Sequence, residues 1–377
     1  MRLLTLHIMN KGRMFIYLCM CFCIGCTAPA GSTEVNVDLD ESTSLDAVTD
    51  YLQPDSLISV SSDEFAIVNC DRVIRRNADI FVLDKMQQAV FKVNTSSKSL
   101  QRIINSKGKA QNEYLSIADI AIDESDNIYV FDGDSRKINL YDSNGVFIRS
   151  INVVYGTSMA LSDNEIAINT NQLEDNQIVV FSPSGELLYQ NEPYGEIPEY
   201  SLDDVCGIAR MNDKFLYTTP FDYNIYKTSK SGSMPFVSFS FGNKEFDAQE
   251  LKGLDYPGFQ DMLRKNSDKV MSLRHLCVND NLVFLSTDRC DQLMYDVKKN
   301  TVVVLSNVEF PYSVLFASPV SVGKDGQFCV VISDSNMRNA YFPWFNNHKT
   351  KLPQLPSKID GNSTDMESLW ILMGHVR

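Results

Sequence analysis

Residues 118–151 alternate short apolar runs with polar turns at the spacing of β-strands. Four strand-like runs stand out, and they cover residues 119–123, 128–132, 137–141 and 146–151. The letters "ESDN" separate the first two runs, and "DSNG" separates the last two. Such turns join antiparallel strands, because Asn and Gly tolerate positive φ and the side chains of Asp and Ser bond back to the backbone. We therefore predict a four-stranded antiparallel meander.

The same pattern recurs along the chain. In residues 70–105, "IFVLD" matches "IYVFD" of the unit above, and "AVFKVN" matches "KINLYD". Further units begin near residues 157, 206, 273 and 318. Four-strand units repeated at intervals of about 40–50 residues are the signature of a β-propeller. The sequence thus predicts an all-β fold, a six-bladed β-propeller of four-stranded antiparallel blades over residues 51–377.

A longer interval separates the fourth and fifth units. Its residues 243–268 read "NKEFDAQELKGLDYPGFQDMLRKNSD", and their Glu, Leu, Lys and Met content predicts a short helical insertion between blades four and five. Such an insertion could cap a central pocket or only decorate the surface, and the sequence leaves both open.

The sixth unit lacks its third and fourth strands directly after Ser333. The run "SLWILMGH", residues 368–375, can supply one of them, and "SLISVSSDEFAIV", residues 56–68, can supply the other. Because unpaired strand edges invite aggregation, we expect the two ends of the chain to share blade six and close the ring.

The N-terminus has the layout of a secretory signal peptide. Lys11 and Arg13 precede an apolar run over residues 14–24, which is too short for a membrane span of roughly 20 residues. The ending Ile24-Gly25-Cys26 resembles a bacterial lipobox, with Cys23 where Leu is usual. We interpret residues 1–25 as a lipoprotein signal peptide and Cys26 as the lipid attachment site. The alternatives are an ordinary cleaved signal peptide and a metal site formed by the clustered cysteines.

Residues 26–50 are small and polar, with several acids, and we predict that they form a flexible tether. Thr27, rather than Asp, follows the lipid site, and by the same resemblance this favours the outer membrane. The expected location is therefore the cell envelope, on the periplasmic face or the cell surface.

The charge and the cysteine content of the chain limit the classes of partner and of fold to consider. The net charge of −14 argues against nucleic acid. Five cysteines remain beyond the anchor, and they are too scattered and odd in number for a disulfide scaffold, although one disulfide stays open: Cys70, Cys206, Cys277, Cys290 and Cys329.

With these units in hand, the chain resembles the six-bladed β-propeller lipoproteins of Bacteroides-type bacteria, which are relatives of NHL-repeat propellers. The stretches "IFVLDKMQQAVFKV" and "EYLSIADIAIDESDNIYVFDGDSRKINLYDSNGVFIRSI" carry the resemblance. Residues 110–112, "AQN", stand where the family usually has Gly-Pro-Gly before Glu-Tyr. The resemblance implies a fold and a location but no activity.

Catalytic motifs are scarce, since the chain has no H-E-x-x-H, G-x-S-x-G, Walker or Rossmann pattern. Arg72, Arg274 and His275 fall on predicted inner strands and could line a funnel for an anionic ligand. A lone His at such a place is more often structural. Asp132 and Asp134 lack the spacing of a calcium loop, and we expect them to close a turn.

Two further groups are candidates. Asp71, Asp119 and Asn279 are the nearest match to the acid, Asn and Asp that hold an axial metal, such as calcium, in lactonase-like propellers. Tyr341 and Trp344 belong to "NAYFPWFNNH", which could form an exposed platform for sugars. An aromatic plug against blade six is the favoured alternative.

We therefore expect a monomeric, lipid-anchored binding module without a cofactor. Its membrane contact is the lipid, and its top face and central funnel hold a glycan, a peptide or a partner protein. The alternative is a metal-dependent hydrolase or lyase of the NHL-like propeller type. Scarce histidine and the lack of an acid–base set favour the binding module.

Overall fold

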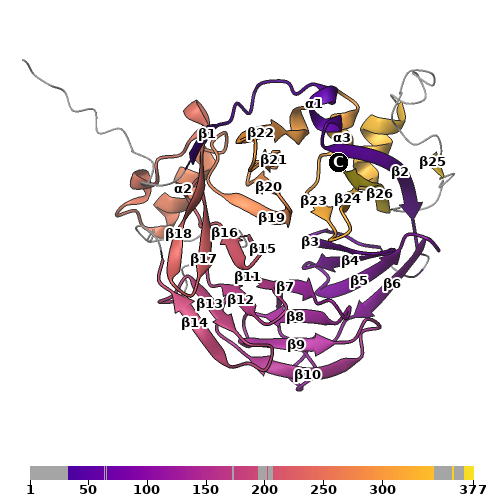
Figure 1. The fold of residues 1–377 in the computed structure, drawn as a ribbon, viewed down its shortest axis with the longest axis vertical. Helices are drawn as coiled ribbons and strands as arrows, with labels where there is room; N and C mark the ends of the chain where they lie inside the picture. Colours follow the sequence, from indigo (N-terminus) through magenta and orange to yellow (C-terminus); the bar gives the residue numbers. More distant parts are fainter. Residues whose placement is uncertain are drawn as a thin grey trace, which may run out of the picture.

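The structure is a computed structural model that describes residues 33–62, 64, 66–171, 174–193, 202, 207–343, 359–360 and 369–377. The described residues form six sheets arranged in a ring (Figure 1), as the sequence predicts, and they are antiparallel except for one short parallel strand at the edge of two of them. Blades one to three contain the strands β3 (Arg72–Arg76), β4 (Asp79–Asp84), β5 (Ala89–Asn94) and β6 (Ser99–Ile104); β7 (Ile117–Ile122), β8 (Ile128–Asp132), β9 (Lys137–Tyr141) and β10 (Phe147–Asn152); and β11 (Ser158–Leu161), β12 (Ile166–Asn169), β13 (Ile178–Phe181) and β14 (Leu187–Asn191).

Blades four and five follow in the same order from the axis outward. They contain the strands β15 (Ile208–Met211), β16 (Lys214–Tyr217), β17 (Asn224–Ser229) and β18 (Gly232–Ser240); and β19 (Leu273–Asn279), β20 (Leu282–Thr287), β21 (Gln292–Asp296) and β22 (Thr301–Val304). The strands predicted within residues 118–151 agree with β7–β10 to within two residues.

The middle strands of the blades are buried on both faces, which explains their unbroken apolar runs. Every residue of β8, "IYVFD", is buried. The predicted turns contain residues with positive φ, as expected: Gly145 in "DSNG" has φ +82°, and Asp126 in "ESDN" has φ +62°. The Asp that ends the second strand organises the next turn, since Asp132 accepts hydrogen bonds from the backbone N–H of Leu115 (2.7 Å) and of Ser135 (3.0 Å).

Blade six is built from both ends of the chain, which confirms the expected closure. Its order is β23 (Val320–Val322), β24 (Gln327–Ile332), β26 (Leu369–Val376), β2 (Leu52–Val60) and the short β25 (Ile359–Asp360). The C-terminal strand β26 pairs antiparallel with β24 on one side and with β2 on the other. The ring is therefore closed by hydrogen bonds between residues about 320 positions apart, and no edge of β26 stays unpaired.

The N-terminal segment corrects one prediction. The predicted flexible tether covers residues 26–50, of which residues 26–32 lie outside the described residues. Residues 33–50, which we call the N-terminal belt, are not a flexible tether, because they pack on the ring. The belt contains β1 (Thr33–Asn36), parallel to β18, and α1 (Leu45–Thr49). The Asn307 side-chain amide donates to the Leu39 carbonyl at 2.6 Å. Four apolar side chains of the belt are at most 7% exposed: Val35, Val37, Leu39 and Val48.

The predicted insertion is helical. It contains η1 (Gly242–Lys244), η2 (Ala248–Leu251) and α2 (Tyr256–Lys265), and Asp255 caps α2 by accepting from the Gly258 backbone N–H at 2.9 Å. Its buried side chains form a small core with Phe221 and Met271. Figure 1 places α2 at the outer margin beside β18. The sequence leaves open whether the insertion caps a central pocket or decorates the surface. The structure favours surface decoration, since no described residue of the insertion lines the central channel.

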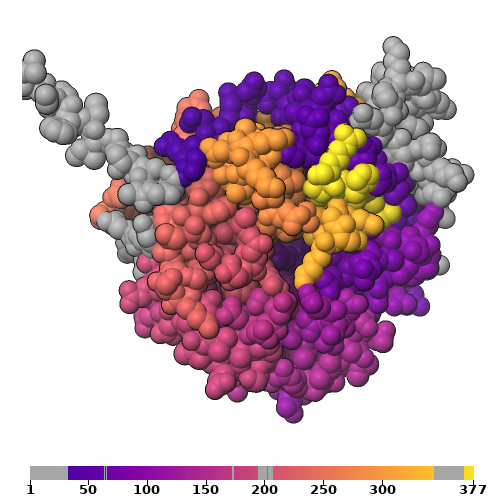
Figure 2. Space-filling view, in the orientation of Figure 1, coloured from indigo at the N-terminus to yellow at the C-terminus, as the bar shows by residue number. Residues whose placement is uncertain are grey.

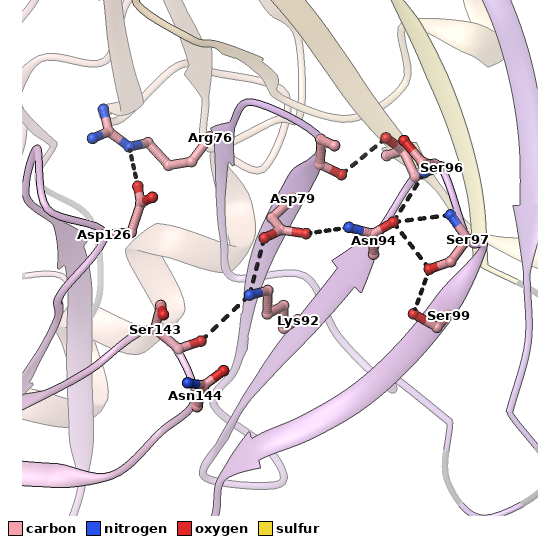
Figure 3. A network of polar contacts seen from close by, with 12 residues as sticks. Arg76, Asp79, Lys92, Asn94, Ser96, Ser97, Ser99, Asp126, Ser143 and Asn144 are labelled. Atoms are coloured by element: carbon pink, nitrogen blue, oxygen red, sulfur yellow. Dashed lines mark hydrogen bonds and ion pairs between the residues drawn. The ribbon is translucent and has the colours of Figure 1, made fainter.

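Polar side chains join neighbouring blades near their turns (Figure 3). Lys92 of blade one makes an ion pair with Asp79 at 2.9 Å and donates to the Ser143 carbonyl of blade two at 3.4 Å. Arg76 reaches Asp126 of blade two at 3.2 Å. These contacts link blade one to blade two. Within the part of the chain described, no helix is long and apolar enough to cross a membrane.

Candidate functional site

An axial channel of about 1400 Å³ occupies the middle of the ring, and Figure 2 shows it as a hollow at the centre. Its walls are the inner strands of the six blades, β3, β7, β11, β15, β19 and β23. These strands all run in one direction. We call the end where they begin, with Arg72, Asp119 and Arg274, the first mouth. The end where they finish, with Asn279 and Gly323, is the second mouth.

The channel has a different charge from the rest of the protein. Its described lining has six basic residues and four acidic ones, although the chain as a whole carries −14. The basic residues are Arg72, Lys85, Arg210, Arg274, Lys324 and Arg338, and the acidic ones are Asp71, Asp119, Asp280 and Asp334. A channel with a local positive balance in an acidic protein is suited to an anionic group.

Three of the arginines in this lining have carboxylate partners. Arg210 contacts Asp163 at 2.7 Å, and Arg338 contacts Asp334 of α4 (Asp334–Asn336). Arg72 lies 3.7 Å from Asp119. Arg274 differs, because none of the described carboxylates lies within ion-pair distance, and its Nε donates only to Ser272 Oγ at 3.3 Å. Its positive charge therefore faces the channel without a counter-charge.

Asp119 connects three blades. It follows a β-bulge in β7, between Ile117 and Asp119, and it is 5% exposed. One carboxylate oxygen accepts from the Ile120 backbone N–H at 2.8 Å, and the other accepts from the Met159 N–H of blade three at 2.9 Å. With Arg72 of blade one beside it, Asp119 acts as a clamp between inner strands. Sequence reasoning placed it in the channel but gave it the role of a ligand-binding residue.

The Arg274–His275 pair lies on a second bulge, in β19. His275 and Leu276 together oppose one residue of β20, because the register shifts between Arg274 and Cys277. His275 has φ +55°, a left-handed conformation that costs a non-Gly residue of the order of 1–3 kcal/mol. Bulges of this kind redirect side chains beside functional sites. Both Arg274 and His275 line the channel, as the sequence predicts.

The three residues considered for an axial metal do not come together. Asp71 and Asp119 lie at the first mouth, where Asp71 accepts from the Lys85 backbone N–H at 2.6 Å. Asn279 ends β19 at the second mouth, and its amide donates to the Gly323 carbonyl at 3.3 Å. About five residues of strand, or roughly 17 Å, separate the two ends. Among the described residues, no group of three His, Cys, Asp or Glu side chains is placed to hold a metal ion.

The aromatic segment packs into blade six. Tyr341, in the π-helix η4 (Met337–Tyr341), is fully buried and meets Phe342 edge-on at 5.9 Å between ring centroids. Phe342 in turn packs on Trp370 of β26 at 4.9 Å. Tyr341 is therefore part of the aromatic plug, and its prediction as a ligand-binding residue is wrong. Trp344 lies outside the described residues.

The described cysteines are free thiols: Cys70, Cys277, Cys290 and Cys329. Burial, together with the nearby charges of Asp84 and Asp71, raises the pKa of Cys70 to about 12. Cys290, in contrast, is exposed and lines the channel, a feature that sequence reasoning missed. The sequence signal that could have indicated an exposed thiol is the position of Cys290 in a turn, two residues before the third strand of blade five. Cys26 and Cys206 lie outside the described residues.

The amino-acid sequence also matches a known protein family. The model of a domain of unknown function, DUF4934, matches residues 61–365. The chain belongs to the DUF4934 family. A comparison of this DUF4934 protein with curated proteins finds no match.

Two crystal structures share the fold of the DUF4934 chain. One is a protein of Bacteroides fragilis whose name assigns it to the exported proteins, with 15% identity, a TM-score of 0.58, and coverage of 91% of this chain and 99% of that one. The other is a DUF4221 member from Bacteroides vulgatus, with 10% identity, a TM-score of 0.52, and coverage of 86% and 98%. Both likenesses concern fold alone, and the relation to NHL-repeat propellers stays a prediction.

Proposed function

We propose that this DUF4934 protein is a lipid-anchored propeller of the cell envelope that binds a ligand, either a glycan, a peptide or a segment of a partner protein, through its axial channel. The channel carries the proposal, since its volume of about 1400 Å³ exceeds the 300–1,000 Å³ typical of small-molecule sites. Its walls combine a positive balance with many neutral polar side chains. We assign the ligand-binding role to the first mouth of this channel.

The envelope location is supported by the signal-peptide layout that ends at Cys26 and by the exported Bacteroides fragilis protein of similar fold. The belt adds a constraint. Only residues 27–32 separate Cys26 from β1, so the lipid would hold the ring within roughly 20 Å of the bilayer, at about 3.4 Å per extended residue. The propeller would thus sit close to the membrane.

The anchor is tested in the native host with the full chain. Cys26→Ser should move the protein from the membrane fraction to the soluble fraction, whereas the matched control Cys23→Ser should leave it in the membrane. Two acyl chains give stable anchoring, so the expected shift is nearly complete. Unchanged membrane retention of Cys26→Ser would refute the lipid assignment.

Channel binding is tested through Cys290. In a Cys206→Ser background, the rate at which Cys290 reacts with a maleimide is measured in the presence of envelope glycans and peptides. A ligand in the channel should slow the reaction. A control thiol at Ser231→Cys, in the exposed turn before β18, should keep its rate. If no glycan or peptide protects Cys290 at millimolar concentration, the channel is not the binding site.

A further inference from the structure

The first mouth holds two arginines, Arg72 and Arg274, most of whose hydrogen-bond donors have no acceptor among the described residues. We propose that Arg274 and Arg72 form an oxyanion-binding site, which takes the carboxylate, sulfate or phosphate group of a small ligand that enters the channel. The proposal rests on the channel-binding function above and names the chemistry that this site recognises.

Arg274 supplies the first part of the argument. A guanidinium has five N–H donors in a planar fork that matches the oxygens of an oxyanion. The described residues give Arg274 one acceptor, the neutral Ser272 hydroxyl, at 3.3 Å. Arg210 is the useful comparison, since it lines the same channel but is held by Asp163 at 2.7 Å. A half-buried cation is unfavourable without a counter-charge, and a bound oxyanion would supply it.

Arg72 supplies the second part. Its nearest carboxylate, Asp119, lies 3.7 Å from Nε, which is beyond hydrogen-bond distance. Both oxygens of Asp119 already accept backbone hydrogen bonds, from Ile120 and Met159. The Arg72 guanidinium donates no hydrogen bond to a described residue, and its side chain is 22% exposed. Arg72 thus keeps donors that can face a ligand.

The two arginines face the same section of the channel. Strand β23 lies between β3, which carries Arg72, and β19, which carries Arg274, and it contacts both. The positive charge of Arg72 also acts on the thiol of Cys277, three residues along β19 from Arg274. One oxyanion between blades one and five would therefore feel both charges.

Asp119 is the one described acid of the first mouth within ion-pair distance of either arginine, and it reaches Arg72 only at 3.7 Å. Asp71 accepts from the Lys85 backbone N–H and from the Asn69 side chain. Asp334 is bonded to Arg338 and to the Trp370 indole N–H, the latter at 3.0 Å. Because Asp119 is also engaged, the carboxylates at this mouth are held in place by the protein, and the positive balance remains available to a ligand.

The test measures binding of two anions, sodium sulfate and methyl β-glucuronide, and of one neutral sugar, methyl β-glucoside. Calorimetry is carried out with the purified full chain at low ionic strength, because surface charge is screened by salt. We expect both anions to bind and the neutral sugar not to bind. Arg274→Gln should weaken anion binding by about 10- to 100-fold, the loss expected for one charge-assisted hydrogen bond.

Two variants control this result. Arg210→Gln removes an equal charge from the same channel but from a paired arginine, and it should change anion affinity by less than about threefold. Arg274→Lys keeps the charge without the fork and should fall between wild type and Arg274→Gln. All variants should unfold within a few degrees of wild type, since none of these side chains belongs to the core.

Each outcome decides the proposal. Absence of anion binding to the wild-type chain at about 5 mM ligand, where ionic strength stays low, overturns it, and so does an equal loss in Arg210→Gln and Arg274→Gln. If neutral glycans or peptides protect Cys290 while anions do not bind, the channel function stands and the oxyanion site fails. If anions bind but nothing larger protects Cys290, the oxyanion site stands and the wider function fails.

Discussion

Removal of β26 should unfold the whole ring. A chain that ends at residue 368 loses the central strand of blade six, which is paired on both edges. Four of its consecutive side chains are at most 8% exposed: Leu369, Trp370, Ile371 and Leu372. At about 1.5–3 kcal/mol for each buried side chain, their loss removes about 6–12 kcal/mol. The total stability of a domain is of the order of 5–15 kcal/mol, so the truncated chain should retain no cooperative fold.

Thermal unfolding followed by circular dichroism measures this effect, with two reference variants. A chain that ends at Gly374 loses only three residues, of which His375 and Arg377 are exposed, and it should melt a few degrees lower than the intact chain. Leu372→Ala should lose about 2–5 kcal/mol through a core cavity, which corresponds to roughly 3–6 °C for a chain of this length. A cooperative transition of the chain 1–368 within about 5 °C of wild type would refute the closure argument.

Three other predictions follow from the described contacts. Leu39→Asp puts a charge into the buried side of the belt and should lower the free energy of unfolding by about 2–4 kcal/mol. The control Glu34→Gln, at an exposed position of the belt, should change that free energy by less than about 0.5 kcal/mol. Equal effects of the two substitutions in urea unfolding would contradict the packing of the belt on the ring. Burial acts to raise the pKa of Asp84, but hydrogen bonds donated by Gln87, Asn69 and Val68 outweigh burial and hold that pKa below its usual value. Asp84→Asn should therefore destabilise the fold by about 1–3 kcal/mol at pH 7. Because the folded-state pKa is depressed, this contribution is present above the unfolded pKa of about 3.9 and is lost as pH falls through the folded-state pKa. The melting temperatures of the variant and of wild type should therefore converge in acid. A difference in melting temperature that stays constant down to about pH 2.5 would exclude this role. In native protein at pH 8, a thiol reagent should modify the exposed Cys290 and spare Cys329, whose burial raises its pKa to about 12, and peptide mapping that finds both modified at similar rates would contradict the packing of β24.

Much of the fold could be predicted because its signals are local. Apolar alternation and turn residues located the four strands of residues 118–151 and the period of the blades, and both depend on neighbours a few positions apart. The closing strands were also predictable, since an apolar run such as "SLWILMGH" at the end of an incomplete blade needs a partner.

The belt shows where composition misled. Acids and small residues suggested a tether, yet Val35, Val37 and Leu39 alternate with polar residues, which is the signature of a half-buried strand. Three apolar positions are too few to outweigh the surrounding acids in a window of this length. The groove that they fill belongs to blades four and five, about 200 residues later in the chain.

Strands, turns and blade number can be read from the amino-acid order alone, because each depends on short-range backbone preferences and on apolar alternation. The contacts of the candidate side chains, in contrast, follow from how the blades pack in the folded ring. Arg72, Asp119 and Arg274 come from three blades, and sequence could place all three at the axis. Whether each charge has a partner depends on bulges and on backbone N–H groups of other strands. That is why Asp119 is engaged as a clamp while Arg274 is left for a ligand.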